Sequence, residues 1–300
     1  MELRDLRYFV AVAENLHFGR AAERLHMTQP ALSRQIRALE VELEVQLFRR
    51  TKRSVQLTIA GQAFLKEARQ ILYQSEQAVS TTRRVARGEM GELRLSFTPS
   101  ALRHVLPKIV RAFRDRYPDV QLTMTERCTL DQVEAFRASQ IDVGFLYPPV
   151  DDKRLTITPL RTEPLVIALP QDYPLATRPH LKLSDLAAEP FILHPRLEGP
   201  YLYDQIIQLC EQAGFRPNVV QEAVASQTRI GLVAAGMGIT FVPETLKDTV
   251  DSTVVYRKLK GVSLSLELAI ARRQDNLSPI VQHFLNIVEE MLETFRLHLA

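Results

Sequence analysis

The chain has 300 residues, more than one hydrophobic core usually supports, so we expect two or three domains. Its formal charge is only +3, but residues 1–58 carry ten Lys and Arg against seven Asp and Glu, a net charge of 10 − 7 = +3. A basic N-terminal segment favours a polyanionic partner. The charged start of the chain lacks the features of a signal peptide, and no apolar run reaches membrane-spanning length. We therefore expect a cytoplasmic protein with no membrane partner.

Three helices are predicted at the start of the chain. Apolar residues recur at helical spacing in residues 3–14, and Ala21, Ala22 and Leu25 share one face of a second, short helix. His26 and Met27 form the turn, and Thr28 is placed to cap a third helix that runs to about residue 47. A helix, a tight turn and a second helix with polar residues near its start predict a helix-turn-helix.

The polar face of this third helix is the predicted DNA-reading surface. Gln29, Ser33, Arg34 and Arg37 would lie on its outer side, and side chains at the start of such a helix read base edges in the major groove. The basic run 49–53, followed by an alternating strand pattern at 55–57, predicts a wing beside the helix.

Residues 58–87 are predicted to form one long helix of roughly 45 Å, at 1.5 Å per residue. Its apolar stripe is longer than a winged domain could cover, so we expect it to pair with a second copy of the chain. An ordinary core helix is the alternative. Arg83, Arg84 and Arg87 with Gly88 would end the helix at a hinge.

From residue 89 strands and helices alternate. Strands at 93–97, 120–125 and 141–146, with helices at 102–117 and 129–139 between them, predict a parallel, doubly wound sheet. A second sheet is predicted from near residue 161. Its strands are 165–169, 191–193, 218–222 and 239–242, and its helices are 201–213 and 227–235. A strand at 264–271 would return to the first lobe, and a helix at 279–297 would cover it. Two lobes joined by two crossings predict a fold like that of the periplasmic binding proteins.

Hydroxyl side chains stand at three places where such a sheet binds ligands. Ser100 follows the first strand, Thr129 follows the second, and Ser226 and Thr228 precede a helix. Side-chain donors beside free backbone N–H groups suit a carboxylate or another small anion.

Enzyme signals are weak. The sequence has no nucleophile elbow, phosphate-binding loop or metal motif, and the pair Gly236 and Gly238 precedes a strand instead of following one. Cys128 and Cys210 match no metal or disulfide spacing, so two reduced, buried thiols are expected. His180 and His194 lie in proline-containing loops and are assigned no chemical role. We expect neither a cofactor nor a metal.

Residues 1–60 resemble the winged helix-turn-helix of the LysR-type transcriptional regulators, through the segments LRYFVAVAE, AAERLHMTQPALSRQI and LTIAG. The likeness continues to about residue 275. It implies that Gln29, Pro30, Ser33 and Arg34 enter the major groove, and that Arg50 and Arg53 of the wing lie on phosphate or in the minor groove.

The effector part resembles two groups within that family, the regulators of acetoin and butanediol synthesis and the benzoate and muconate regulators. CEQAGFRPNVVQEA and GLVAAGMGITFVP are closest to the acetoin group. The resemblance implies effector contacts by Ser100 and Thr129, opposed by Pro200, Tyr201 and Leu202. Tyr147 stands where muconate regulators carry an arginine. A bidentate carboxylate clamp is thereby lost, which disfavours a dicarboxylate and leaves a smaller monocarboxylate or an aromatic acid.

The sequence therefore predicts a DNA-binding domain at 1–58, a dimerising linker helix at 59–88 and an effector domain at 89–300. The fold class is α/β with an all-α-type winged helix-turn-helix at the N-terminus. Lobe I would comprise about 89–161 and 266–300, and lobe II about 162–265. The family implies a tetramer, double-stranded promoter DNA, a small organic acid, RNA polymerase as a further partner and an activator's role. A small-molecule binding protein or a cytoplasmic enzyme on the same two-lobed fold are the alternatives.

Overall fold

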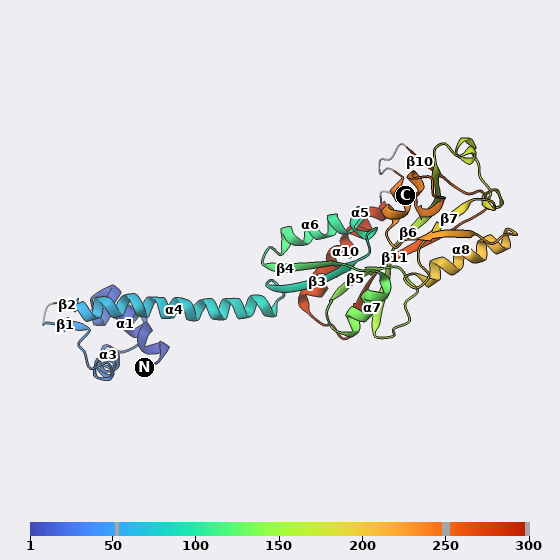
Figure 1. Cartoon of the computed structure of the whole chain (residues 1–300). Helices are drawn as coiled ribbons and strands as arrows, with labels where there is room; N and C mark the ends of the chain where they lie inside the picture. The colour runs from blue at the N-terminus through green and yellow to red at the C-terminus, as the bar shows by residue number, and fades with distance from the viewer. Residues whose placement is uncertain (52–53, 248–252, 298–300) are drawn as a thin grey trace. The chain divides into compact units, whose positions relative to one another are not determined.

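The structure is a computed structural model that describes residues 1–51, 54–247 and 253–297. It separates into two compact units, Met1–Ala86 and Arg87–Ala300. Figure 1 shows both units and labels many of their elements.

Three helices and a short ribbon precede a long helix in the first unit. They are α1 (Leu3–Asn15), α2 (Phe18–Arg24), α3 (Gln29–Glu42), the antiparallel strands β1 (Phe48–Arg50) and β2 (Val55–Leu57), and α4 (Ile59–Ala86). The predicted helix-turn-helix is therefore confirmed, with His26 in a left-handed conformation at the turn. Thr28 occupies the predicted cap position, but its side chain makes no capping hydrogen bond. The core lies between α1, α2 and α3, where Phe9, Leu32 and Ile36 are fully buried.

The start of α4 is held tightly against the ribbon. Thr58 Oγ donates to the carbonyl of Gln46 at 2.7 Å and accepts from the N–H of Gly61 at 2.9 Å. A Cβ at position 61 would lie 2.1 Å from the carbonyl oxygen of Leu47, so only glycine permits this approach. Further along, only Ala68 of α4 is buried, and apolar side chains such as Ile71, at 39% exposure, stay open.

The second unit is built on one seven-stranded sheet. Its order is β10 (Val254–Arg257), β6 (Leu155–Pro170), β11 (Ser265–Arg273), β5 (Val143–Leu146), β3 (Gly91–Phe97) and β4 (Val120–Glu126), and β9 (Thr240–Pro243) also pairs with β6. β3 is parallel to β4 and β5, as the alternating pattern predicts, and β11 is antiparallel to β5 and β6. A separate parallel pair contains β7 (Pro190–Leu193) and β8 (Asn218–Glu222).

Helices and short 3-10 turns surround these strands. They are α5 (Ala101–His104), α6 (Leu106–Arg116), α7 (Thr129–Arg137), η1 (Pro174–Thr177), η2 (Leu183–Leu186), α8 (Pro200–Gln212), α9 (Ser226–Ala234), η3 (Glu244–Leu246) and α10 (Pro279–Leu297). In the first lobe Phe113, Phe145 and Phe284 meet in one core. In the second lobe α8 packs over a separate core that includes Phe191 and Phe241.

Three details differ from the sequence-based expectation. The predicted restart near residue 161 is wrong, because β6 runs through both lobes as a single strand of 16 residues. Pro159 and Pro164 hid this strand, since proline removes a ladder hydrogen bond. The predicted helix 102–117 is interrupted at Val105, because Pro107 has no N–H to continue the ladder. β10 was not predicted.

Candidate DNA-binding surface and effector site

The predicted reading residues lie together on the outer face of α3. Gln29, Pro30 and Arg34 are exposed and Ser33 is partly buried, while Leu32 on the opposite side is fully buried. One turn therefore carries an amide, a hydroxyl and a guanidinium at the surface. These groups are suited to hydrogen bonding with adenine and guanine edges.

Arg50 is engaged inside the protein. Its Nη2 lies 2.7 Å from Oε2 of Glu40, its Nη1 donates to Ser33 Oγ at 3.4 Å, and its guanidinium lies 4.7 Å from the centre of the Phe18 ring. Glu40 Oε1 also accepts from the N–H groups of Leu47 and Phe48, at 2.9 and 3.0 Å. Arg50 therefore joins the ribbon to α3, and its contact with DNA stays a prediction. Arg53 lies outside the described residues.

In the first lobe, two of the predicted effector residues lie on one hydrogen-bonded chain. The hydroxyls of Ser100 and Tyr147 are hydrogen bonded, and Tyr147 donates to Glu163 Oε2 at 2.8 Å. Thr129 Oγ accepts from the backbone N–H of Tyr147 at 3.2 Å. Ser100 follows β3, Thr129 begins α7 and Tyr147 follows β5, so the strand ends bring the three together.

Burial controls the protonation and the hydrogen bonding of Tyr147 and Glu163. Burial first, and then the neighbouring Glu163, raises the pKa of Tyr147 well above its usual value, so its phenol stays a proton donor at neutral pH. Glu163 is fully buried, and its Oε1 has no hydrogen-bond partner among the described residues. A buried carboxyl oxygen without a partner is rare and marks a site for a polar ligand or water.

In the second lobe, a buried arginine and a partly buried histidine lie close together. Arg229 is 4% exposed and donates to the carbonyls of Ala223 and Val224 and to Ser226 Oγ, at 2.8, 2.9 and 3.0 Å. Burial lowers its pKa to about 10, so it stays charged at neutral pH. Burial, and then Arg229, lowers the pKa of His194 to about 4, with Glu198 opposing the shift. His194 is therefore neutral, and its Nδ1 has no partner among the described residues.

Cys128 of the first lobe lies near Glu198 of the second. Burial and a hydrogen bond with Glu198 raise the pKa of the Cys128 thiol to about 12. Cys128 immediately precedes Thr129 in the first lobe, and Glu198 lies just before Pro200 in the second. This contact marks the interface of the lobes. Cys210 is buried, as expected, but Cys128 is only partly so.

The opposing residues predicted on the second lobe lie in different environments. Pro200 and Tyr201 are exposed at the start of α8, whereas Leu202 belongs to the apolar core. Ser226 is tied to Arg229, and Thr228 is exposed.

Sequence reasoning missed four polar residues of this region: Glu163, His194, Glu198 and Arg229. One signal was readable. Arg229 precedes Ile230 and lies four residues before Val233 on the buried face of α9, so a charge on an apolar face pointed to an internal role. His194 lies in a loop, as expected, and the surrounding fold partly buries it. Within the described ranges, no three His, Cys, Asp or Glu side chains could hold a metal ion, and no helix is long and apolar enough to span a membrane.

Comparisons with known proteins agree with this architecture. Residues 3–62 match the family described as bacterial regulatory helix-turn-helix protein, lysR family, and residues 86–293 match the LysR substrate binding domain. The HTH-type transcriptional regulator AlsR of Bacillus subtilis (strain 168) is 47% identical over 287 residues, covering 96% of this chain and 95% of that protein. The HTH-type transcriptional regulator CatR of Pseudomonas putida is 39% identical over 293 residues, covering 98% and 100%.

A solved structure supports the same assignment. Full-length CbnR complexed with its target DNA has a TM-score of 0.82 at 30% identity, covering 97% of this chain and 100% of that one. The fold class predicted from the sequence is thereby confirmed. Because both family matches and the full-length relatives agree in order and extent, this chain belongs to the LysR-type transcriptional regulators, which bind DNA through the helix-turn-helix and carry an effector-binding domain.

Proposed function

We propose that this regulator senses a small organic acid between the two lobes of its effector domain. The observation that carries the proposal is the chain from Ser100 through Tyr147 to the buried Glu163, which ends in an unpaired carboxyl oxygen. Hydroxyl donors at strand ends suit one carboxylate group. Tyr147 is neutral and donates its proton to Glu163, so the site has no cationic clamp, and a monocarboxylate or an aromatic acid fits better than a dicarboxylate.

The second lobe supports the same ligand class. The guanidinium of Arg229 and the carboxylate of Glu198 both act on the pKa of His194, and Glu198 also acts on the pKa of Cys128 in the first lobe. An acid bound here would touch both lobes. It would therefore favour one closure over another by its difference in affinity for the two states.

We also propose which residues contact DNA and how the chains assemble. Gln29, Pro30, Ser33 and Arg34 would contact bases of the promoter, with Arg53 on the wing. Helix α4 would pair two chains through its open apolar side chains, and a tetramer would place two such pairs on the DNA. We propose a cytoplasmic regulator that contacts RNA polymerase and activates transcription, without catalytic function, cofactor or metal.

The proposed effector site is tested by measuring the fluorescence anisotropy of the chain's own upstream DNA as protein is added. Acetate, benzoate and muconate are added in separate experiments. We expect one monocarboxylate to change the affinity or the bending of the DNA in the native protein. Ser100→Ala and Tyr147→Phe should lose that response while unliganded DNA binding persists. An unchanged response in both variants would exclude this chain of hydroxyls as the effector site.

The DNA surface is tested with Arg34→Ala on the same fragment. The loss of a guanine contact costs about 1–3 kcal/mol and relaxes specificity at one base pair. Equal weakening on random DNA would show that Arg34 contacts only phosphate. Light scattering at low concentration tests the pairing, and a monomer would refute it.

A further inference from the structure

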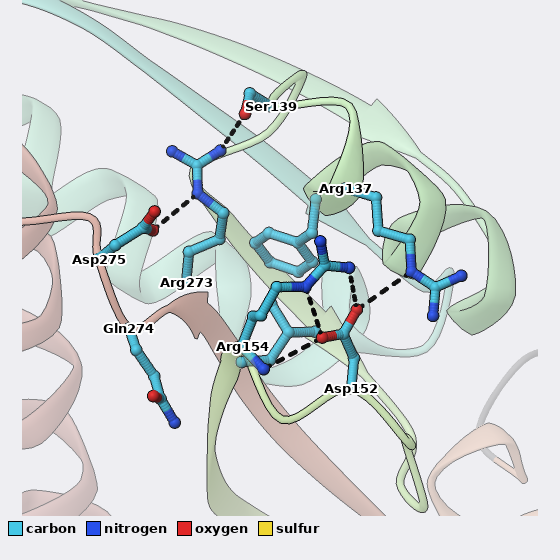
Figure 2. A pocket seen from close by; sticks show the side chains of 9 residues that line it. Arg137, Ser139, Asp152, Arg154, Arg273, Gln274 and Asp275 are labelled. Carbon is cyan, nitrogen blue, oxygen red and sulfur yellow. Dashed lines mark hydrogen bonds and ion pairs between the residues drawn. The ribbon is translucent and has the colours of Figure 1, made fainter.

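A polar cavity lies in the first lobe, away from the Ser100 chain. It has a volume of about 330 Å³ and is shown in Figure 2. Three arginines surround it: Arg137 at the end of α7, Arg154 just before β6 and Arg273 at the end of β11. The carboxylates that line it are Asp152 and Asp275, so its lining carries one net positive charge.

Each of the three guanidinium groups makes hydrogen bonds through two of its nitrogens. The third nitrogen makes none within the described residues. Arg154 donates through Nε and Nη2 to Asp152 at 2.9 and 2.6 Å. Arg137 donates through Nε to Asp152 at 3.1 Å and through Nη1 to Glu134 at 2.6 Å. Arg273 donates through Nε to Asp275 at 3.1 Å.

The remaining bond of Arg273 runs from Nη1 to Ser139 Oγ at 2.6 Å. Nη2 of Arg137, Nη1 of Arg154 and Nη2 of Arg273 therefore make no hydrogen bond within the described residues. Asp152 is only 5% exposed in its side chain, so it fixes two of the three guanidinium groups before any ligand arrives. Such preorganisation lowers the cost of binding.

We propose that this cavity binds a small multivalent oxyanion of the phosphate class. Three arginines line one cavity, and the guanidinium fork matches the oxygens of phosphate. The volume is at the lower end of the range for small-molecule sites, so it admits phosphate or a small phosphate monoester.

The cavity is separate from the site at Tyr147. Thr129 begins α7 and Arg137 ends it. Along β6, Glu163 lies eight residues beyond Leu155, a separation of roughly 26 Å in an extended strand. Arg273 pairs with Leu155, and the N–H of Gln274 donates to the carbonyl of Arg154 at 2.8 Å. The anion would thus bind at the end of the β6–β11 pairing that lies in the first lobe.

The test is calorimetric titration of the full-length protein with inorganic phosphate at constant ionic strength. We expect saturable binding in the native chain, weakened about tenfold or more in Arg273→Gln, because a charge-assisted hydrogen bond is lost. Arg137→Gln provides a second variant if the first does not fold. Arg116→Gln is the matched control, since Arg116 pairs with Glu290 on the surface elsewhere in this unit.

Two further arms separate the sources of binding. The titration is repeated with glycerol phosphate in place of phosphate. Whichever of the two binds more tightly shows whether the cavity prefers a phosphorylated metabolite or the free ion. Arg34→Ala and Ser100→Ala should retain native affinity for phosphate. The first alters the DNA-reading surface and the second alters the proposed effector site, and neither residue lines the cavity. Equal affinity in Arg273→Gln, Arg137→Gln and the native chain would overturn the proposal, as would a loss confined to Arg34→Ala. These results are independent of any response to monocarboxylates.

Discussion

Replacing Glu40 by glutamine or alanine is expected to loosen the wing from the DNA-reading helix. The carboxylate accepts three hydrogen bonds, from Arg50 and from the N–H groups of Leu47 and Phe48. Its side chain is 13% exposed and that of Arg50 is 25% exposed, so solvent replaces these bonds only in part. Glutamine keeps an acceptor for the N–H groups and loses the ion pair, whereas alanine removes all three bonds.

The magnitudes follow from these contacts. Removing one partner of a buried ion pair lowers the free energy of unfolding by about 3–5 kcal/mol, because the other charge stays buried without its partner. For Glu40→Ala we expect the lower part of that range, because both side chains keep some contact with solvent. Glu40→Gln should cost about 1–2 kcal/mol, the value of one charge-assisted bond discounted for exposure.

Hydrogen exchange with mass spectrometry on peptides covering residues 44–50 measures the opening free energy of this segment. A double-mutant cycle with Arg50→Gln then isolates the pair, since contacting residues couple by about 0.5–3 kcal/mol. Both single variants should also weaken binding to the specific promoter. Additive effects in the cycle, or tighter promoter binding by Glu40→Gln, would refute the internal role and indicate that Arg50 is free to contact DNA.

Three other substitutions test the effector unit. Tyr147→Phe should destabilise it by about 1–3 kcal/mol in chemical denaturation, because the buried Glu163 loses a donor; an unchanged midpoint would contradict this. His194 has a folded-state pKa of about 4 against an ordinary 6.5, so the unfolded chain binds the proton first and stability falls as pH drops from 6.5 towards 4. In His194→Gln the pH slope should be shallower in this window, and an identical slope would argue against a neutral buried imidazole. Gly144→Ala would place a Cβ 2.6 Å from Gln132 Oε1, so we expect a loss of about 1–3 kcal/mol in a thermal melt, and no loss would show that the amide can move.

Local patterns in the sequence predicted much of the fold. The apolar spacing in α3 and α10 and the alternation of strands in the first lobe reflect one buried face per element, which a single chain reveals. Only residues 165–169 of β6 were predicted as a strand. The prolines of β6 locally disfavour a strand, and it is the pairing with β11 that stabilises the rest. The break at Val105 depends on one missing N–H.

The candidate site was less accessible to sequence reasoning. Hydroxyls after strands pointed to Ser100 and Thr129, since strand ends converge in any doubly wound sheet. Glu163 and His194 owe their properties to burial by distant segments, which periodicity does not reveal. The basic run at the wing suggested DNA for Arg50, and spacing along the sequence did not reveal that Glu40, ten residues earlier, pairs with it.

The close approach at Gly61 has a consequence for how this regulator could reposition its DNA-binding part. Because no side chain separates α4 from the wing there, the helix and the three-helix core turn as one rigid arm. The arm is 28 residues long, roughly 42 Å at 1.5 Å per residue. A tilt of about 5° at its far end would carry the reading helix about 4 Å along the duplex, close to one base-pair step of 3.4 Å. Leverage of this kind turns a slight change at the base of the helix into a different register on DNA.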